Sequence, residues 1–323
     1  MLVALAGCGG GSTQASSTGA RSAGSSTAAS SSSARSQPGA TSTTTHVVTH
    51  QVPKPPPPPA YPQLLGVARS SQPTPFVPAV LWNGSPVAWI SRSPSGVAML
   101  SFKQPELQLR LHSGTTDAGT LGWRYGPVIA GLELKRLIAA LNGGFRLNIG
   151  AGGFESLGRV AVPLTNGLGS VVTYVDGITD IGSWHQEVPD PAKPVASVRQ
   201  NLPLLIDHGA PASTLDCVSC WDATLGGVID PARSAFGIQP DGHLVWAGAE
   251  HATVSDLADA LLSAGVVRAV QLDINPEWVA GYLYGHRGGA GPPGPVPVVP
   301  GQQGIPGQYL APWSRDFFTI VTS

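Results

Sequence analysis

The chain has 323 residues, a formal net charge of −1 and only 11% charged side chains. A charge this small gives no basic footprint for nucleic acid, so we expect no nucleic-acid partner. No apolar run approaches the roughly 20 residues of a membrane-spanning helix.

The first eight residues resemble the end of a bacterial lipoprotein signal. Leu5-Ala6-Gly7-Cys8 has the small-residue pattern that precedes a lipidated cysteine. The segment before Cys8 is shorter than an ordinary signal, so we interpret residues 1–8 as a truncated one; an accidental match is the alternative. A lipid on Cys8 would anchor the chain to the outer face of the cell membrane, which predicts an extracytoplasmic location.

Residues 9–74 have the composition of a disordered linker. They are rich in Ser, Thr, Ala and Gly and end in a proline-rich stretch with five consecutive prolines at 55–59. Such a segment buries too little apolar surface to offset the entropy lost on ordering. We therefore expect a tether followed by one folded domain over residues 75–323.

Short apolar runs between turn residues predict strands at 76–82, 87–91, 97–102 and 107–112. The run 132–141 has apolar residues at helical spacing and is followed by Gly143 and Gly144, which predicts a helix. Asp176-Gly177 and Asp241-Gly242 indicate hairpin turns between further strands.

A second helix is expected over 253–265, capped by Thr253 or Ser255 and ended by Gly265. The sequence then predicts a buried strand at 266–274, a long Gly/Pro loop at 285–308 and a last strand at 315–323. Together these elements predict an α+β fold: a largely antiparallel or mixed sheet core with two or more packed helices, in a single domain.

Cys217 and Cys220 form a Cys-x-x-Cys pair without the further ligands of a zinc site. A structural disulfide and a thioredoxin-type redox pair are both open, and the loop-like flanks favour the disulfide. No metal site or cofactor is expected, although a divalent cation near Asp273 is left open.

Polar residues gather at the ends of several apolar elements. These are Asn142-Gly143-Gly144, Arg199 to Asn201, Arg233, and Asp273 with Glu277 and Trp278. A carboxylate at the mouth of a buried strand is costly unless it is paired or used, and arginine offers a planar fork of donors that suits phosphate. His112 follows a strand, where either a structural role or a pocket position is open.

The order of the stretches "LNGGF", "VRQNLPLL", "RSAFGI", "QLDINPEW" and "RDFF" resembles the phosphodiester glycosidase family, in particular an actinobacterial branch. The resemblance implies hydrolysis of the glycosidic bond of a sugar-1-phosphodiester, with a carbohydrate or glycolipid of the cell envelope as substrate. Better-known members carry Leu-Asp-Gly-Gly-Gly-Ser where this chain has Leu-Asp-Ile-Asn-Pro-Glu from residue 272.

The resemblance also implies roles for the polar residues. Asp273 would be the carboxylate that acts on the sugar or on water, with Glu277 as a second carboxylate, and Arg199 and Arg233 would hold phosphate. The implied substrate-binding residues are Asn142, Gly143, Gly144, Asn201, Trp278 and His112. Two alternatives stay open: a non-catalytic lipoprotein that binds glycans or sugar phosphates, and a thiol–disulfide protein that uses Cys217 and Cys220.

Overall fold

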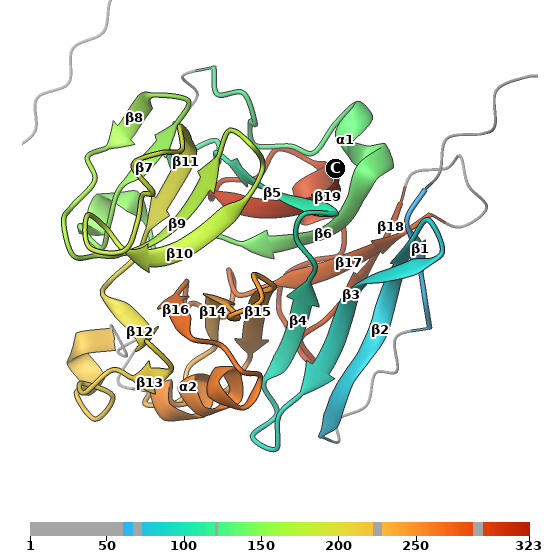
Figure 1. Cartoon of the computed structure of the whole chain (residues 1–323). Coiled ribbons are helices and arrows are strands. Elements are labelled where there is room, and N and C mark those ends of the chain that lie inside the picture. The colour runs from blue at the N-terminus through green and yellow to red at the C-terminus, as the bar shows by residue number, and fades with distance from the viewer. Residues whose placement is uncertain (1–60, 67–72, 120–121, 222–227, 287–292) are drawn as a thin grey trace, which may run out of the picture. The chain divides into compact units, whose positions relative to one another are not determined.

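A computed structural model describes residues 61–66, 73–119, 122–221, 228–286 and 293–323, all within one compact unit. Cys8, the expected signal and most of the expected linker lie outside these residues. The described residues form three antiparallel sheets with two α-helices (Figure 1). The fold is mostly β, so the expected α+β class is wrong. No helix in the described part of the chain has the length and apolar character needed to cross a bilayer.

Sheet A is the largest of the three sheets. Its strands follow the order β1 (Gln63–Leu64), β2 (Thr74–Trp82), β3 (Ser85–Arg92), β4 (Ala98–Phe102), β15 (Leu244–Ala249), β14 (Arg233–Ile238), β16 (Arg268–Gln271), β12 (Leu204–Asp207) and β13 (Ala210–Pro211). Strand β1 lies within the range 9–74, so ordered structure begins before the boundary expected at residue 75.

Sheets B and C have five strands each. Sheet B runs in the order β18 (Gly294–Pro297), β17 (Gly281–Gly285), β6 (Leu137–Asn142), β19 (Phe317–Thr322) and β5 (Leu107–His112). Sheet C runs in the order β10 (Thr179–Ser183), β9 (Gly169–Tyr174), β11 (Val195–Gln200), β7 (Phe154–Ser156) and β8 (Arg159–Val162). Strand β18 lies in the range 285–308, where only a loop was expected.

The helix expected over 132–141 is a short helix followed by a strand. Helix α1 spans only Leu132–Arg136, and the chain continues as β6, where every residue is buried. Strand β6 pairs with β17 on one side and β19 on the other. A strand covered on both faces needs a continuous apolar run, and such a run matches helical spacing equally well.

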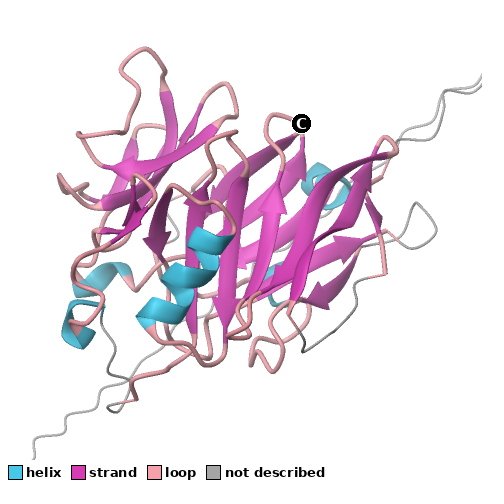
Figure 2. Cartoon of the chain, turned by 60° about the horizontal axis from the view of Figure 1, so that its bottom comes forward, coloured by secondary structure: helices cyan, strands magenta, loops and turns pink. Residues whose placement is uncertain are grey.

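Helix α2 (Val254–Ser263) forms as the sequence predicts. The Thr253 hydroxyl accepts a hydrogen bond from the Asp256 amide, and the Asp256 carboxylate accepts one from the Thr253 amide, so the two residues form a capping box. The helix lies along one face of sheet A (Figure 2). Its buried residues, among them Leu257 and Leu261, pack there against Val245 and Ala269.

The main hydrophobic core contains residues of all three sheets, with Phe102 and Phe236 from A, Leu141 and Phe318 from B, and Phe154 from C. The ends of strands from the three sheets therefore come close together beside this core. Three short 3-10 helices lie in the connections: η1 (Leu147–Ile149), η2 (Val218–Trp221) and η3 (Gln308–Leu310).

The disulfide between Cys217 and Cys220 is confirmed, and it lies in the η2 turn. The next residue, Trp221, is buried, and its indole donates to the Thr214 carbonyl at 2.9 Å. Its own carbonyl accepts a hydrogen bond from Gln271 of β16 at 3.2 Å. The disulfide therefore holds a turn that is attached directly to sheet A.

Candidate active site at the junction of three sheets

Three charged side chains at strand ends bring the sheets together. Arg199 lies near the end of β11 in sheet C, Asp316 immediately precedes β19 in sheet B, and Asp273 follows β16 in sheet A. All three side chains are buried. Burying charge is costly unless each charge finds a partner, so the local pairing decides whether this junction is stable.

Arg199 and Asp316 form a two-pronged ion pair. Arg199 Nε donates to Asp316 Oδ2 at 2.8 Å and Nη2 donates to Oδ1 at 3.1 Å. Arg199 also donates from Nη1 to the Gln200 carbonyl and from Nη2 to the Phe145 carbonyl. The guanidinium is therefore already occupied, which makes Arg199 a positioning group between sheets B and C.

Arg315, the residue before Asp316, bridges two further carboxylates. Its Nε donates to Asp117, and its Nη2 donates to Asp273 at 2.8 Å and to the Gly144 carbonyl at 2.9 Å. Among the described residues, no hydrogen bond uses Arg315 Nη1. We call Asp117, Asp273, Arg315, Arg199 and Asp316 the charged cluster. Within it, Arg315 is the arginine with a guanidinium nitrogen, Nη1, that forms no hydrogen bond to the described residues, whereas every guanidinium nitrogen of Arg199 donates at least once.

The surroundings of Asp273 pull its pKa in two directions. Burial raises the pKa of Asp273, while the charge of Arg315 and the backbone amides of Asn275 and Ile274 oppose the rise. The two amides donate to Oδ1 at 2.9 and 2.8 Å. The net direction is upward, so this carboxylate accepts a proton more readily than an ordinary aspartate does.

The pKa of Arg315 is also raised. Burial lowers the pKa of this guanidinium, but Asp273, Asp316 and Asp117 more than offset that effect. Arg315 therefore stays cationic and contributes a fixed positive charge beside two carboxylates. A divalent cation near Asp273 would have to compete with this guanidinium for the same oxygens.

The expected Asn142-Gly143-Gly144 stretch lies against the charged cluster. A Cβ at Gly143 would lie 2.1 Å from Asp316 Oδ2, and one at Gly144 would lie 2.8 Å from Arg199 Cζ. Both positions therefore require glycine for close approach of the backbone. Asn142 donates to the Ser234 hydroxyl at 2.8 Å, which ties β6 to β14.

Asn201 performs the corresponding task between sheets C and A. Its Nδ2 donates to the Gln271 carbonyl at 2.6 Å, and its Oδ1 accepts from the Phe145 amide at 3.0 Å. The structure thus brings together six of the residues expected from the sequence. They are Asn142, Gly143, Gly144, Arg199, Asn201 and Asp273.

Trp278 also lies beside the charged cluster. The Arg315 guanidinium carbon is 5.0 Å from the centre of its ring, and Trp313 packs edge-on against it at 5.7 Å. The ring is half-buried. An aromatic face next to a cation is a common surface for the apolar side of a sugar ring.

Three expected site residues lie outside the charged cluster. Arg233 donates to the Ala252 carbonyl at 2.9 Å and to Gln271 at 2.9 Å, whereas its neighbour Ser234 contacts Asn142. Successive strand residues point to opposite faces, so Arg233 lies on the α2 side of sheet A. Burial lowers the pKa of Arg233 to about 10.

Glu277 and His112 are also placed elsewhere. Glu277 is exposed, and no described residue forms an ion pair with it. His112 is buried in β5, where it contacts Glu133 at 3.0 Å and stacks on Phe317. These contacts explain His112 as a structural residue.

Sequence reasoning missed Asp117, Arg315 and Asp316 as site residues. Arg315 and Asp316 stand directly before the apolar strand β19, much as Arg233 and Ser234 stand at the start of β14. That position was a usable signal, because charge at a strand end is unusual in a chain so poor in charge. Asp117 lies in a polar loop and carries no comparable signal.

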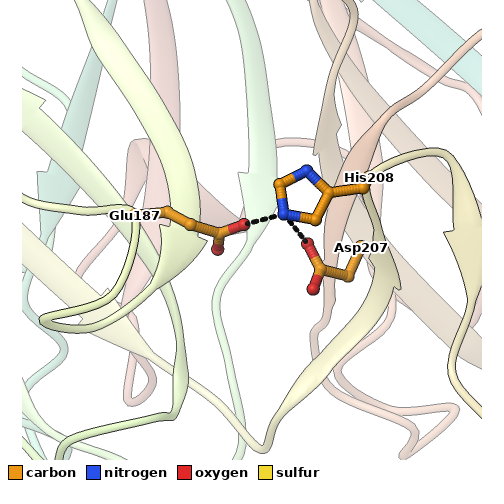
Figure 3. Close-up of side chains that lie close together, drawn as sticks. All are labelled: Glu187, Asp207 and His208. Carbon is orange, nitrogen blue, oxygen red and sulfur yellow. Dashed lines mark ion pairs between the residues drawn. The ribbon is translucent and has the colours of Figure 1, made fainter.

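One group of side chains has the geometry of a possible metal site among the described residues. Figure 3 shows Glu187, Asp207 and His208, whose ligand atoms lie within 4.8 Å of one another. His208 Nε2 is 3.4 Å from Glu187 and 3.7 Å from Asp207, and its side chain is 81% exposed. These contacts are explained by surface ion pairing, and the group includes no member of the charged cluster.

Comparison with known proteins gives distant structural likenesses. No protein-family model and no curated protein sequence matches the chain. The catalytic domain of zebrafish N-acetylglucosamine-1-phosphodiester alpha-N-acetylglucosaminidase, auto-inhibited by its pro-peptide, is similar over 82% of this chain and 88% of that one, with 14% identity and a TM-score of 0.46. A hypothetical protein from Synechocystis is similar over 75% of this chain and 63% of that one, with 13% identity and a TM-score of 0.41. Likeness at this level does not assign an activity to this chain.

Proposed function

We propose that the chain is a hydrolase that cleaves the glycosidic bond of a sugar-1-phosphodiester at the charged cluster. The observation that carries this proposal is the position of Arg315. It bridges Asp117 and Asp273, keeps Nη1 free among the described residues, and lies on the Trp278 ring. A cation, a carboxylate and an aromatic face thus meet at one point.

The chemistry of the reaction needs these three features. Water attacks the anomeric carbon, the bond from that carbon to the phosphate oxygen breaks, and the products are a free sugar and a phosphate monoester. The phosphate leaves with negative charge, which the Arg315 cation would stabilise through Nη1. The transition state resembles an oxocarbenium ion, which a carboxylate such as Asp273 would stabilise while it helps to deprotonate water.

The direction of the Asp273 pKa supports its role as a base. Burial raises this pKa, and a base whose pKa is closer to neutrality accepts a proton more effectively at physiological pH. Trp278 would support the sugar ring, and Arg199 would act indirectly, by fixing the loop that carries Gly144.

A second candidate function is a binding protein without catalysis. It is favoured because both carboxylate oxygens of Asp273 already accept hydrogen bonds. Oδ1 accepts from two backbone amides, and Oδ2 accepts from Arg315. In addition, the expected second carboxylate, Glu277, is exposed and lies outside the cluster. The same site would then hold a sugar phosphate without hydrolysing it.

The two functions are separated by assaying alkyl diesters of several sugar 1-phosphates with the full chain. We expect wild type to release free sugar and Asp273→Asn to lower the rate by about 100-fold or more. The control Asp259→Asn makes the same chemical change on the exposed face of α2 and should leave the rate unchanged. If Asp273→Asn fails to fold, as judged by circular dichroism, Arg315→Lys tests the same site. Binding of the diesters by wild type without release of sugar would establish the second function.

We also propose that the protein works outside the cytoplasm, anchored by a lipid on Cys8. The Cys217–Cys220 disulfide supports an oxidising compartment. Palmitate labelling tests the anchor: with an ordinary signal peptide fused to the chain, wild type should incorporate label and Cys8→Ser should not. Equal labelling of the two proteins would reject the anchor.

A further inference from the structure

A separate cavity of about 200 Å³ lies between strand β5 of sheet B and one face of sheet C. It includes no member of the charged cluster. Strand β5 is the outer strand of sheet B, so its side chains can face the neighbouring sheet. The cavity is therefore formed where the two sheets meet, independently of the Asp273 site.

The floor of this cavity is a row of hydroxyl groups. Ser197 of β11 lies directly opposite Ser156 of β7 and opposite Thr173 of β9. Residues directly opposite each other on paired strands point to the same face of a sheet, and all three residues line the cavity.

Two of these hydroxyls have no partner in the described part of the chain. Ser156 is 7% exposed and Ser197 is 8% exposed, and neither side chain makes a hydrogen bond there. Thr173 is satisfied by Thr179 at 2.9 Å. Neither oxygen is fully enclosed, so both hydroxyls open onto the cavity and are placed to bind a polar ligand there.

The opposite wall carries positive charge. The guanidinium carbons of Arg110 and Arg124 lie 5.0 and 5.5 Å from the centre of the Tyr125 ring. Arg110 is 3.6 Å from Glu133, a carboxylate that also accepts from Thr319 at 2.6 Å. Arg124 forms no ion pair within the described ranges. Two cations and one shared carboxylate leave this wall with a net positive charge.

We propose that this cavity binds a phosphorylated monosaccharide. The arginines would hold the phosphate, the Tyr125 ring would support the sugar, and Ser156 and Ser197 would bind its hydroxyls. The cavity is smaller than the roughly 300–1,000 Å³ of a drug-sized pocket, which limits the ligand to about one sugar unit. This site does not depend on the proposed hydrolysis.

Glucose 6-phosphate is the appropriate probe, because it contains no sugar-1-phosphodiester for the proposed hydrolase to cleave. We expect calorimetry on the full chain to show binding, weakened about tenfold by Arg124→Gln and about fivefold by Ser197→Ala. The control Arg136→Gln removes the same charge from an exposed position outside the cavity and should bind as wild type does.

Four results would overturn the proposal. The first is no binding by wild type in the millimolar range. The second is unchanged binding by folded Arg124→Gln and Ser197→Ala. The third is loss of binding in Arg315→Lys with retention in Arg124→Gln, which would place the ligand at the charged cluster. The fourth comes from inorganic phosphate and glucose, which are measured in parallel: phosphate alone binding as tightly as glucose 6-phosphate would show that the sugar contributes nothing.

Discussion

Arg199 and Asp316 are joined by two hydrogen bonds of 2.8 and 3.1 Å, and each residue is 1% exposed. Removing one member leaves the other charge buried and unpaired. We predict that Arg199→Met lowers the free energy of unfolding by about 3–5 kcal/mol, measured by urea denaturation. The control Arg268→Met breaks a more accessible pair with Asp180 and should cost only about 0–1 kcal/mol. Equal effects of the two substitutions would contradict a structural role for the Arg199 pair.

The backbone at Gly143 passes too close to Asp316 for a side chain. We predict that Gly143→Ala displaces Asp316 and destabilises the fold by more than about 1 kcal/mol. Gly126→Ala is the control, because a Cβ there meets nothing within 4 Å and the backbone does not require glycine. Thermal melting compares the two variants, and a Gly143→Ala variant as stable as Gly126→Ala would contradict the observed close approach.

Of the two hydroxyl residues near the start of helix α2, only Thr253 acts as its N-cap. Thr253→Ala removes the acceptor for the Asp256 amide and should cost about 1 kcal/mol. Ser255→Ala, two residues further on, removes no cap and should change stability by less than about 0.5 kcal/mol. Chemical denaturation of both variants tests the assignment, which the reverse order of effects would overturn.

The buried Glu133 predicts an acid-dependent loss of stability. Burial would raise its pKa, but His112, Thr319 and Arg110 more than offset this, and the net pKa is lowered. The folded-state pKa thus lies below the ordinary value of about 4.3. The carboxylate therefore stabilises the fold above that value, and this contribution is lost as pH falls through the folded-state pKa.

The substitution Glu133→Gln tests this predicted loss of stability at acid pH. The free energy of unfolding of wild type should exceed that of the variant most at pH 7, and the difference should shrink below about pH 4. Urea denaturation at several pH values measures it. A difference that stays constant down to acid pH would show that Glu133 contributes through packing rather than charge.

Replacing Cys217 tests whether the disulfide has a structural role or a redox role. Cys217→Ser opens a very short loop, for which the chain-entropy estimate is a loss of about 2 kcal/mol. We expect this loss of stability with sugar release or binding retained, and no reduction of a test disulfide by wild type with a thiol donor. Catalysis of disulfide reduction by wild type, abolished in Cys217→Ser, would instead support a thiol–disulfide protein.

Local signals were enough to predict part of the fold. The hairpin of β14 and β15 and helix α2 follow from their own turn and cap residues: Asp241-Gly242, Thr253 and Gly265. Asp241 accepts a hydrogen bond from the His243 amide at 3.0 Å, so that turn is defined within a few residues. Such elements need no information from distant parts of the chain.

The sequence-based predictions are wrong or incomplete where tertiary contacts determine the local structure. Strand β6 is a strand because β17 and β19 bind both of its edges, and its own sequence does not distinguish this from a helix. Asp117 and Arg315 meet across 198 positions of sequence, so neither residue alone predicted the pair. Polarity at strand ends located the candidate site, but the assignment of each arginine required its partners.

Strand β19 has a consequence for the order of folding. It lies between β5 and β6, and its Thr319 contacts His112 across 207 positions of sequence. Until residues 315–322 have emerged from the ribosome, β5 has no partner strand in sheet B, one edge of β6 is unpaired, and Arg199 has no counter-charge. Assembly of sheet B and of the charged cluster must therefore follow synthesis of nearly the whole described chain, and until then these open edges are available to pair with a neighbouring chain.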